Sequence, residues 1–129
     1  MRGLWAPALG LVLLGHWPTA HAAPPAIAST EIKYLLDFVD RSGCQFYRNG
    51  SWYDSHRAQS HLRAKYDYLV ARDRIKSAED FIDQAATQSS VSGEAYQIRC
   101  EAGPALPSTR WLRTALSDYR SSRAHPAPH

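Results

Sequence analysis

The sequence predicts a small α+β domain with four helices and a minimal two- to three-stranded antiparallel sheet, in the order α-β(β)-α-α-β-α. Four segments repeat apolar residues at intervals of three and four, which is the period of an amphipathic helix. The pair Asn49-Gly50 lies between two aromatic runs and indicates a hairpin, because both turn residues tolerate positive φ. Residues 96–100 alternate as a strand does. A chain of 129 residues is short enough to form one domain.

The first 22 residues have the order of a secretory signal peptide. Arg2 precedes an apolar run over residues 3–15, and Ala20 and Ala22 supply the small residues that a signal peptidase accepts. This run is shorter than the roughly 20 residues of a membrane-spanning helix, and no later stretch is long enough to span a bilayer. We therefore expect cleavage after Ala22, export to a bacterial periplasm and no transmembrane segment.

The exported part divides into a leader, a domain and a tail. Residues 23–29 form a Pro-containing leader that we expect to be flexible, residues 30–120 form the globular domain, and residues 121–129 form a disordered tail. Thr30 is the expected N-cap of the first helix. The apolar stripe of this helix consists of Ile32, Leu35, Leu36 and Val39, and Gly43 ends it.

Residues 44–48 and 51–53 are the expected arms of the hairpin. Because the second arm is short, the turn could instead lead directly into the next helix. Asp54 or Ser55 would cap that helix, which ends near Asp73, and Ser77 opens a third helix. A single continuous helix over residues 55–87 is the alternative, although it would be long for so small a domain.

The C-terminal third supplies a loop, a strand and a helix. Residues 88–93 form a hydroxyl-rich loop ahead of the strand at 96–100. Gly103-Pro104 and Pro107 mark a turn, and Ser108 is the expected cap of the last helix. The apolar face of this helix consists of Trp111, Leu112, Ala115, Leu116 and Tyr119.

The chain has two cysteines, Cys44 and Cys100, and each lies in a strand-like segment. Two cysteines in an exported protein usually pair. We therefore expect a disulfide across the sheet, which would stabilise the fold by roughly 4 kcal/mol in the chain-entropy description. The alternative is two buried free thiols.

Four ordered blocks of the chain resemble a known family. They are Phe46-x-Arg48-Asn49-Gly50, His61-Leu62-Arg63-x-Lys65, Arg74-Ile75-x-Ser77-Ala78-Glu79-x-Phe81-Ile82 and Ser89-Ser90-x-Ser92-Gly93-x-x-Tyr96. Together they are similar to the YfeK-like family of small bacterial periplasmic proteins, from about Glu31 to Tyr119. The resemblance implies a signal peptide, a compact α+β domain and a periplasmic location, and it implies no activity. The family pattern has Gly-Lys-Pro-Tyr where this chain has Gly93-Glu94-Ala95-Tyr96, so a ligand contact made by that lysine would be absent here.

His61 and Lys65 are the first candidate site residues. They are four apart and share one helix face, on or beside the apolar stripe that should face inward. A cation and an imidazole are costly there unless they have partners or line a cleft. They could contact an anionic ligand, with His61 available as an acid or base. The alternative is a histidine hydrogen-bonded at the edge of the core and a lysine whose ammonium reaches water.

The second candidate is the serine cluster Ser89, Ser90 and Ser92. A serine nucleophile would need a base such as His61, but the chain has no Gly-x-Ser-x-Gly and no Ser-x-x-Lys motif. These hydroxyls can instead satisfy their own backbone in a turn, or bind a polar ligand without chemistry.

We expect no metal site and no cofactor. His56 and His61 are five apart, which separates them by about 140° around a helix, whereas a zinc pair needs one face. The net charge of +3 is mild and does not indicate nucleic-acid binding.

These features predict a monomeric, non-enzymatic binding or interaction module. Its candidate surface consists of Arg48, Asn49, His61, Lys65, Ser90, Ser92 and Arg99. The expected partner is an envelope protein or an anionic glycan. The alternative function is a small serine hydrolase that uses Ser90 or Ser92 with His61, and a third is a domain that only supports a larger envelope complex.

Overall fold

The computed structural model describes residues 3, 5, 7–8, 10–15 and 23–125. Its elements follow the chain as α1 (Ala26–Arg41), β1 (Gln45–Arg48), β2 (Ser51–Tyr53), α2 (Ser55–Val70), α3 (Ala78–Ala85), β3 (Gln97–Arg99), β4 (Leu106–Pro107) and α4 (Ser108–Ala124). This confirms the predicted α+β class, although the described residues form a four-stranded sheet instead of a two- or three-stranded one. The predicted cleavage after Ala22 and residues 126–129 of the expected tail lie outside the described residues.

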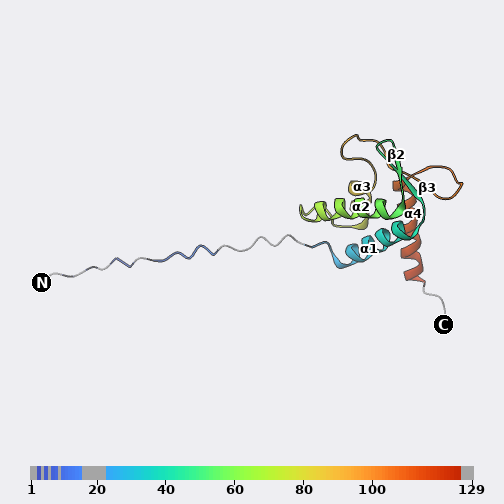
Figure 1. The fold of residues 1–129 in the computed structure, drawn as a ribbon. Helices are drawn as coiled ribbons and strands as arrows, with labels where there is room; N and C mark the ends of the chain where they lie inside the picture. Colours follow the sequence, from blue (N-terminus) through green and yellow to red (C-terminus); the bar gives the residue numbers. More distant parts are fainter. Residues whose placement is uncertain (1–2, 4, 6, 9, 16–22, 126–129) are drawn as a thin grey trace.

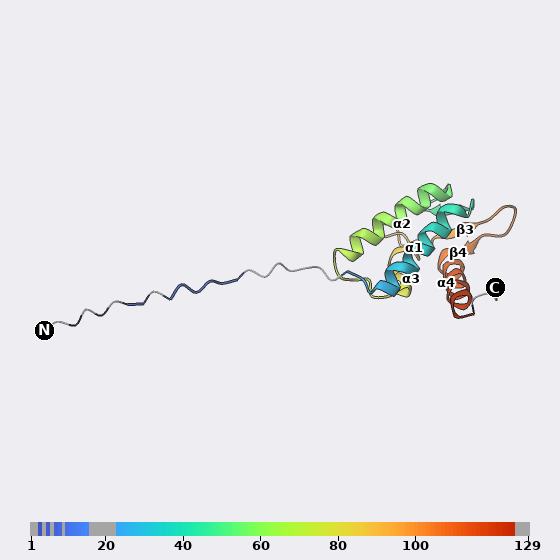
Figure 2. The same ribbon diagram turned by 90° about the horizontal axis from the view of Figure 1, so that it is seen from below.

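Helices α1 and α2 lie side by side in both views of the ribbon (Figures 1 and 2). The sheet stands at the end of this pair where α1 leads into β1 and β2 leads into α2. Burial of apolar side chains between the helices and the inner face of the sheet is the main source of stability. The largest of the fully buried apolar side chains are Ile32, Leu35, Val39, Ile75, Phe81, Ile82, Ile98 and Leu112. None of the helices in the described part of the chain is long and apolar enough to span a bilayer.

Two predicted N-caps define the start of α2 and α3. The Asp54 carboxylate accepts the backbone N–H of Arg57 at 2.8 Å, and the Ser77 hydroxyl accepts the backbone N–H of Asp80 at 3.1 Å. These bonds satisfy donors that a helix start leaves unpaired. The chain therefore forms two separate helices here, and the alternative of a single helix over residues 55–87 is wrong. Helix α2 ends at Val70, slightly before the predicted end near Asp73.

The predicted caps of the first and last helices are wrong. Helix α1 begins at Ala26, and Thr30 lies inside it, where its hydroxyl donates to the Ala26 carbonyl at 3.0 Å. The extra turn forms because Ala28 is buried in the core. Helix α4 begins at Ser108 without a side-chain cap and continues through residues 121–124 of the expected tail.

The hairpin is confirmed, and its turn residues explain it. Asn49 and Gly50 have φ of 49° and 85°, which is the left-handed geometry that a two-residue hairpin turn requires. β1 therefore pairs with β2 directly, and the turn does not run straight into α2.

The sheet is antiparallel with strand order β2-β1-β3-β4. Strand β4 is the element that the sequence analysis missed. It has two residues, and Pro107 indicated only a turn, because proline lacks the N–H that a central strand needs. Proline is tolerated here since β4 lies at the edge of the sheet.

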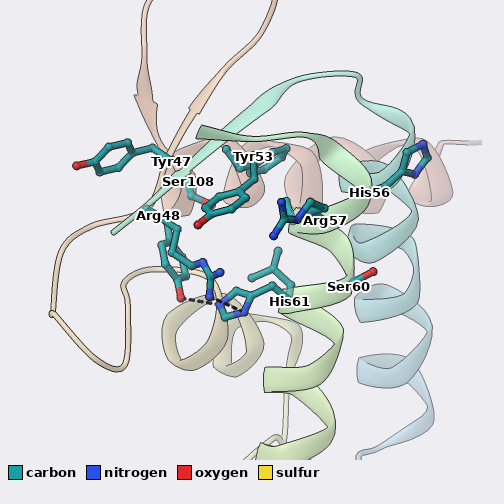
Figure 3. Close-up of a pocket in the computed structure, with 12 residues that line it drawn as sticks. Tyr47, Arg48, Tyr53, His56, Arg57, Ser60, His61 and Ser108 are labelled. Carbon is teal, nitrogen blue, oxygen red and sulfur yellow. Dashed lines mark hydrogen bonds between the residues drawn. The ribbon is translucent and has the colours of Figure 1, made fainter. Parts of the chain in front are cut away.

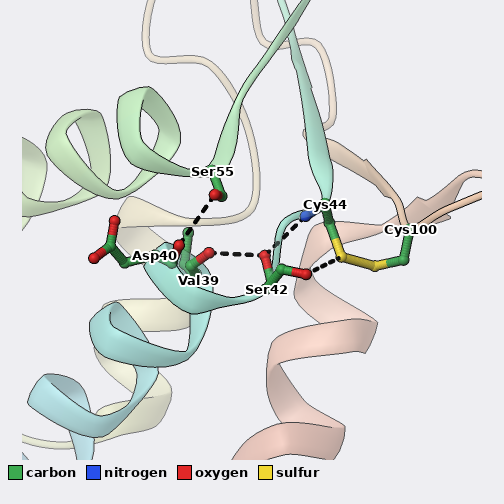
Figure 4. The surroundings of a disulfide bond; sticks show 6 residues. All are labelled: Val39, Asp40, Ser42, Cys44, Ser55 and Cys100. Carbon is green, nitrogen blue, oxygen red and sulfur yellow. Dashed lines mark hydrogen bonds between the residues drawn. A yellow bond between two sulfur atoms is a disulfide. The ribbon is translucent and has the colours of Figure 1, made fainter.

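A disulfide joins Cys44 to Cys100 and confirms the predicted pairing, so neither cysteine is a free thiol (Figure 4). Cys44 directly precedes β1 and Cys100 directly follows β3. Because Gln45 pairs with Arg99, the two cysteines continue the register of this strand pair by one position. The covalent bond therefore closes one end of the β1–β3 ladder.

A cluster of three charged side chains ties α1, α3 and α4 together. Arg120 donates to both carboxylate oxygens of Glu31, at 2.6 and 2.9 Å, and also to Glu79. The Glu31 side chain is only 9% exposed. The hydrogen bond from Arg120 lowers the pKa of Glu79, and the two carboxylates raise the pKa of Arg120. This cluster is a structural link, since none of its three residues lines the pocket described below.

Candidate functional site

A pocket of about 310 Å³ lies between the β1–β2 hairpin and α2, with the start of α4 on its inner side (Figure 3). Its lining combines aromatic rings with basic and hydroxyl side chains: Phe46, Tyr47, Arg48, Tyr53, His56, Arg57, Ala58, Ser60, His61, Leu62, Tyr96 and Ser108. None of these residues is acidic. The inner wall consists of the buried residues Phe46, Leu62, Tyr96 and Ser108.

Strand register places Arg48 and Tyr96 beside each other. Phe46 pairs with Ile98 and Tyr47 with Gln97, so the next position of this ladder sets Arg48 opposite Tyr96. Side chains two positions apart on a strand share a face, and Phe46 on this face is buried. Arg48 therefore points to the side of the hairpin that faces α2.

A chain of hydrogen bonds connects these strands to α2. Arg48 Nη1 lies 3.1 Å from His61 Nδ1 (Figure 3), and His61 Nε2 lies 3.0 Å from the Tyr96 hydroxyl oxygen. A guanidinium has only donors, so Nδ1 must accept, and the imidazole proton must be on Nε2. His61 thus donates to Tyr96 in its neutral form.

Lys65 completes this chain from the next turn of α2. Its Nζ donates to the Tyr96 hydroxyl oxygen at 3.2 Å and to the Gln88 carbonyl at 3.0 Å. Lys65 is half-buried and does not line the pocket. It therefore holds Tyr96 and the loop at residue 88 in place from behind.

Burial and neighbouring positive charge govern the protonation of these groups. Burial, reinforced by Arg48 and Lys65, lowers the pKa of His61 to about 4. Burial and Arg48 also lower the pKa of Lys65. Burial raises the pKa of the Tyr96 hydroxyl, and the charge of Arg48 opposes this shift. His61 and Tyr96 are therefore both neutral near pH 7, in agreement with their hydrogen bonds.

The cations around the pocket have no carboxylate partner within the described residues. Arg48 and Arg57 instead lie over the ring of Tyr53, with guanidinium carbons 5.1 and 4.8 Å from its centroid. Cation–π contacts of this kind leave the N–H groups free to bind other acceptors. His56, at the side of the pocket, differs because it pairs with Asp40. The pocket therefore has a net excess of hydrogen-bond donors and positive charge.

The structure brings together some of the predicted site residues and separates others. Arg48, His61 and Lys65 belong to one hydrogen-bonded chain. Ser92 Oγ donates to Asn49 Oδ1 at 2.5 Å, which ties the 88–93 loop to the hairpin turn. Ser90 is exposed in that loop. Neither Asn49 nor either serine lines the pocket or hydrogen-bonds to His61.

Arg99 lies on the other face of the sheet. Its strand neighbour Ile98 is buried, so Arg99 points away from the core. There it stacks over the Trp52 ring at 4.2 Å and donates to Gln45 Oε1 at 2.7 Å. Tyr47 also points away from His61, as Figure 3 shows.

Of the residues that line the pocket, the predicted candidate surface contained only Arg48 and His61. The residues that it missed include Tyr53, Arg57, Tyr96 and Ser108. Two features of the sequence could have indicated that Tyr96 belongs to the site. It belongs to one of the four blocks that resemble the known family, and the predicted Cys44–Cys100 disulfide sets a register that pairs Arg48 with Tyr96. The alternating pattern of residues 96–100 had placed Tyr96 in a strand without a functional role. Ser108 was interpreted as a helix cap.

Metal binding finds no support in the described part of the chain, where no cluster of three or more histidine, cysteine or acidic side chains is suitable for an ion. The basic side chains and the hydroxyl groups of the site, with no carboxylate among the lining residues, suit an anion better than a cation.

The fold and the pocket define a small disulfide-linked α+β domain with a basic, aromatic-walled cleft. The chain belongs to a family of unknown function, DUF5329, whose model matches residues 26–120. It is also similar to the uncharacterised protein YfeK of Salmonella typhimurium (strain LT2), with 35% identity over 86 residues, which cover 67% of this chain and 68% of that protein. The YfeK-like resemblance is thereby confirmed. No solved structure matches the chain.

Proposed function

We propose that this protein is a non-enzymatic binding module whose pocket takes an anionic group of a ligand or partner. The hydrogen-bonded chain Arg48–His61–Tyr96–Lys65 supports this most directly. Two cations lie close to a neutral imidazole, and no carboxylate within the described residues balances them. Like charges at short range destabilise each other, so a bound anion would relieve an unfavourable arrangement.

The arrangement around His61 offers no support for the alternative, a serine hydrolase. A general base must reach the hydroxyl that it deprotonates. Both ring nitrogens of His61 already have other partners, Arg48 and Tyr96. The Ser92 hydroxyl is bonded to Asn49 instead. The binding role is therefore the better proposal.

Export to the periplasm is part of the same proposal. The apolar residues Leu11 to Leu14 are about 80% exposed and contribute nothing to the core, as expected of a leader that is removed. The Cys44–Cys100 disulfide suits an oxidising compartment. Protein recovered from the periplasm of a bacterial host should have Ala23 as its first residue by mass spectrometry. An intact chain that stays in the cytosol with both thiols free would contradict this part.

An anionic glycan or an envelope protein remains the proposed partner, with the chain acting as a monomer. Both partner classes can present carboxylates or phosphates to the pocket. The third alternative, a purely supporting role in an envelope complex, would not require a basic pocket. The two roles therefore differ in whether a small anion binds.

Calorimetric titration of the purified protein with acetate, benzoate, phosphate and sulfate at low ionic strength tests this function. We expect at least one of these anions to bind, and the Arg48→Gln variant to weaken its affinity at least tenfold. Arg63→Gln is the matched control, because Arg63 is exposed on α2, pairs with Asp67 and does not line the pocket. It removes the same charge away from the pocket and should leave the affinity unchanged. Absence of binding by all four anions, or an equal loss in both variants, would refute a specific anion site.

A further inference from the structure

Ser108 lines the pocket, and its hydroxyl is accessible from that space and makes no hydrogen bond within the described residues. Ser108 is 1% exposed and lines the inner wall, and only its backbone N–H is engaged within the described residues, donating to the Tyr96 carbonyl at 2.9 Å. No fully buried side-chain oxygen or nitrogen of the described residues lacks a partner, so this hydroxyl is reachable by water or by a ligand in the pocket. Ser108 is the first residue of α4, a helix of 17 residues that has no side-chain cap. The positive end of the helix dipole thus faces the same space.

The Tyr96 hydroxyl also has a proton that no hydrogen bond within the described residues uses. Its oxygen accepts from His61 Nε2 and from Lys65 Nζ, so both of its acceptor positions are used. The hydroxyl proton must then point elsewhere, and within the described residues it makes no hydrogen bond. Two hydroxyl donors, Tyr96 and Ser108, therefore occur on residues that a backbone hydrogen bond joins.

The remaining wall is apolar and partly aromatic. Phe46 and Leu62 are buried in it, and Tyr53 and Ala58 are half-buried. Aromatic walls favour flat ligands that stack against or meet the edges of the rings. A volume of about 310 Å³ is at the lower end for ligand pockets, which limits the ligand to one or two rings.

We propose that the pocket binds a carboxylate borne directly on a six-membered ring, with the carboxylate at the Tyr96 and Ser108 hydroxyls and Arg48, and the ring against Phe46, Tyr53 and Leu62. This rests on the anion-binding function proposed above and names its ligand class. A carboxylate has two oxygens and only accepts hydrogen bonds, so it matches two hydroxyl donors and one guanidinium. Aromatic acids and uronic acids both have this chemistry.

The test compares five probes by calorimetry on the purified protein: benzoate, glucuronate, acetate, phenyl phosphate and benzyl alcohol. We expect benzoate or glucuronate to bind at least tenfold more tightly than each of the other three. Preference for benzoate indicates an aromatic acid, and preference for glucuronate indicates an acidic sugar. Acetate binding as tightly as both ring acids would overturn the ring requirement but leave the anion site intact. Tighter binding of phenyl phosphate would overturn the carboxylate assignment and would also leave the anion site intact.

Two variants locate the carboxylate. Tyr96→Phe and Ser108→Ala each remove a single oxygen, and we expect each to weaken the preferred ring acid by about threefold to tenfold. Tyr68→Phe and Ser117→Ala are matched controls at exposed positions of α2 and α4 and should have no effect. If both pocket variants bind the ring acid as tightly as the unaltered protein, this placement is wrong. If benzyl alcohol binds as tightly as benzoate, the ligand class and the anion-binding function both fail.

Discussion

His61 and Tyr96 are 35 residues apart in the chain, and their side chains share a hydrogen bond of 3.0 Å. The imidazole donates through Nε2 in this bond, and its Nδ1 accepts from Arg48, which requires a neutral ring. Protonation of His61 would place a third positive charge between Arg48 and Lys65. The protonation state of the His61 ring therefore affects both the stability of the fold and the geometry of the pocket.

We predict that stability decreases as the pH falls from about 6.5 to about 4. The pKa of His61 is about 4 in the folded protein and near 6.5 when unfolded, so the unfolded state binds the extra proton in this window. The free energy of unfolding should fall by about 1–2 kcal/mol from this group, after a discount for its partial exposure. Urea denaturation across this range measures the effect.

The His61→Gln variant should lose this part of the pH dependence, whereas His56→Gln should retain it. His56 is exposed and pairs with Asp40 at the side of the pocket. An identical pH profile for the unaltered protein and His61→Gln would contradict the assignment.

Replacement of Lys65 by methionine should separate stability from binding. The lowered pKa of Lys65 means that its charged form is disfavoured in the folded state, so the variant should be as stable or up to about 1 kcal/mol more stable. Loss of the hydrogen bonds to Tyr96 and Gln88 should weaken anion binding severalfold, since Tyr96 is then less well positioned. Lys76→Met, at an exposed position, should change neither quantity. A large loss of stability without loss of affinity would oppose this role.

Replacement of Arg120 by methionine should destabilise the fold by about 2–3 kcal/mol, because it leaves the nearly buried Glu31 carboxylate unpaired. Arg113→Met is the matched control. Arg113 pairs with Asp83 on the surface, where both side chains are about half exposed, and its loss should cost no more than about 0.5 kcal/mol. Chemical denaturation compares the two variants, and equal losses would rule out a special role for the buried carboxylate.

Reduction of the disulfide should lower the free energy of unfolding by about 4 kcal/mol, since Cys44 and Cys100 are 56 residues apart. Urea denaturation with and without dithiothreitol measures this. The double variant Cys44→Ala/Cys100→Ala should show a similar loss and no further response to the reductant. A response in the double variant would mean that the reductant acts elsewhere.

Local chemistry explains which parts of the fold were predictable. Asp54 and Ser77 capped their helices as expected, because a cap depends on a few neighbouring residues. Asn49-Gly50 formed the hairpin turn for the same reason. Thr30 failed as a cap because burial of Ala28, a contact between distant segments, extends the helix.

The pocket was less predictable, since it depends on contacts across the chain. His61 and Lys65 were found because polar groups on an apolar helix face need an explanation. Tyr96 was not found, because an aromatic residue at a strand looks like core until the register with β1 is known. Strand β4 was missed because two residues carry too little periodicity, and one of them is a proline.

The Cys44–Cys100 disulfide affects when the pocket becomes able to bind a ligand. Cys44 and Cys100 close one end of the β1–β3 ladder, while Arg48 and Tyr96 occupy its other end. In a newly made chain without the disulfide, the three residue pairs of this ladder align those two donors without covalent support. We expect such a chain to bind poorly and to ignore the abundant acids of the compartment where it is synthesised. Under the proposed export, formation of the disulfide in the periplasm would fix this ladder, and the binding pocket would become competent only there.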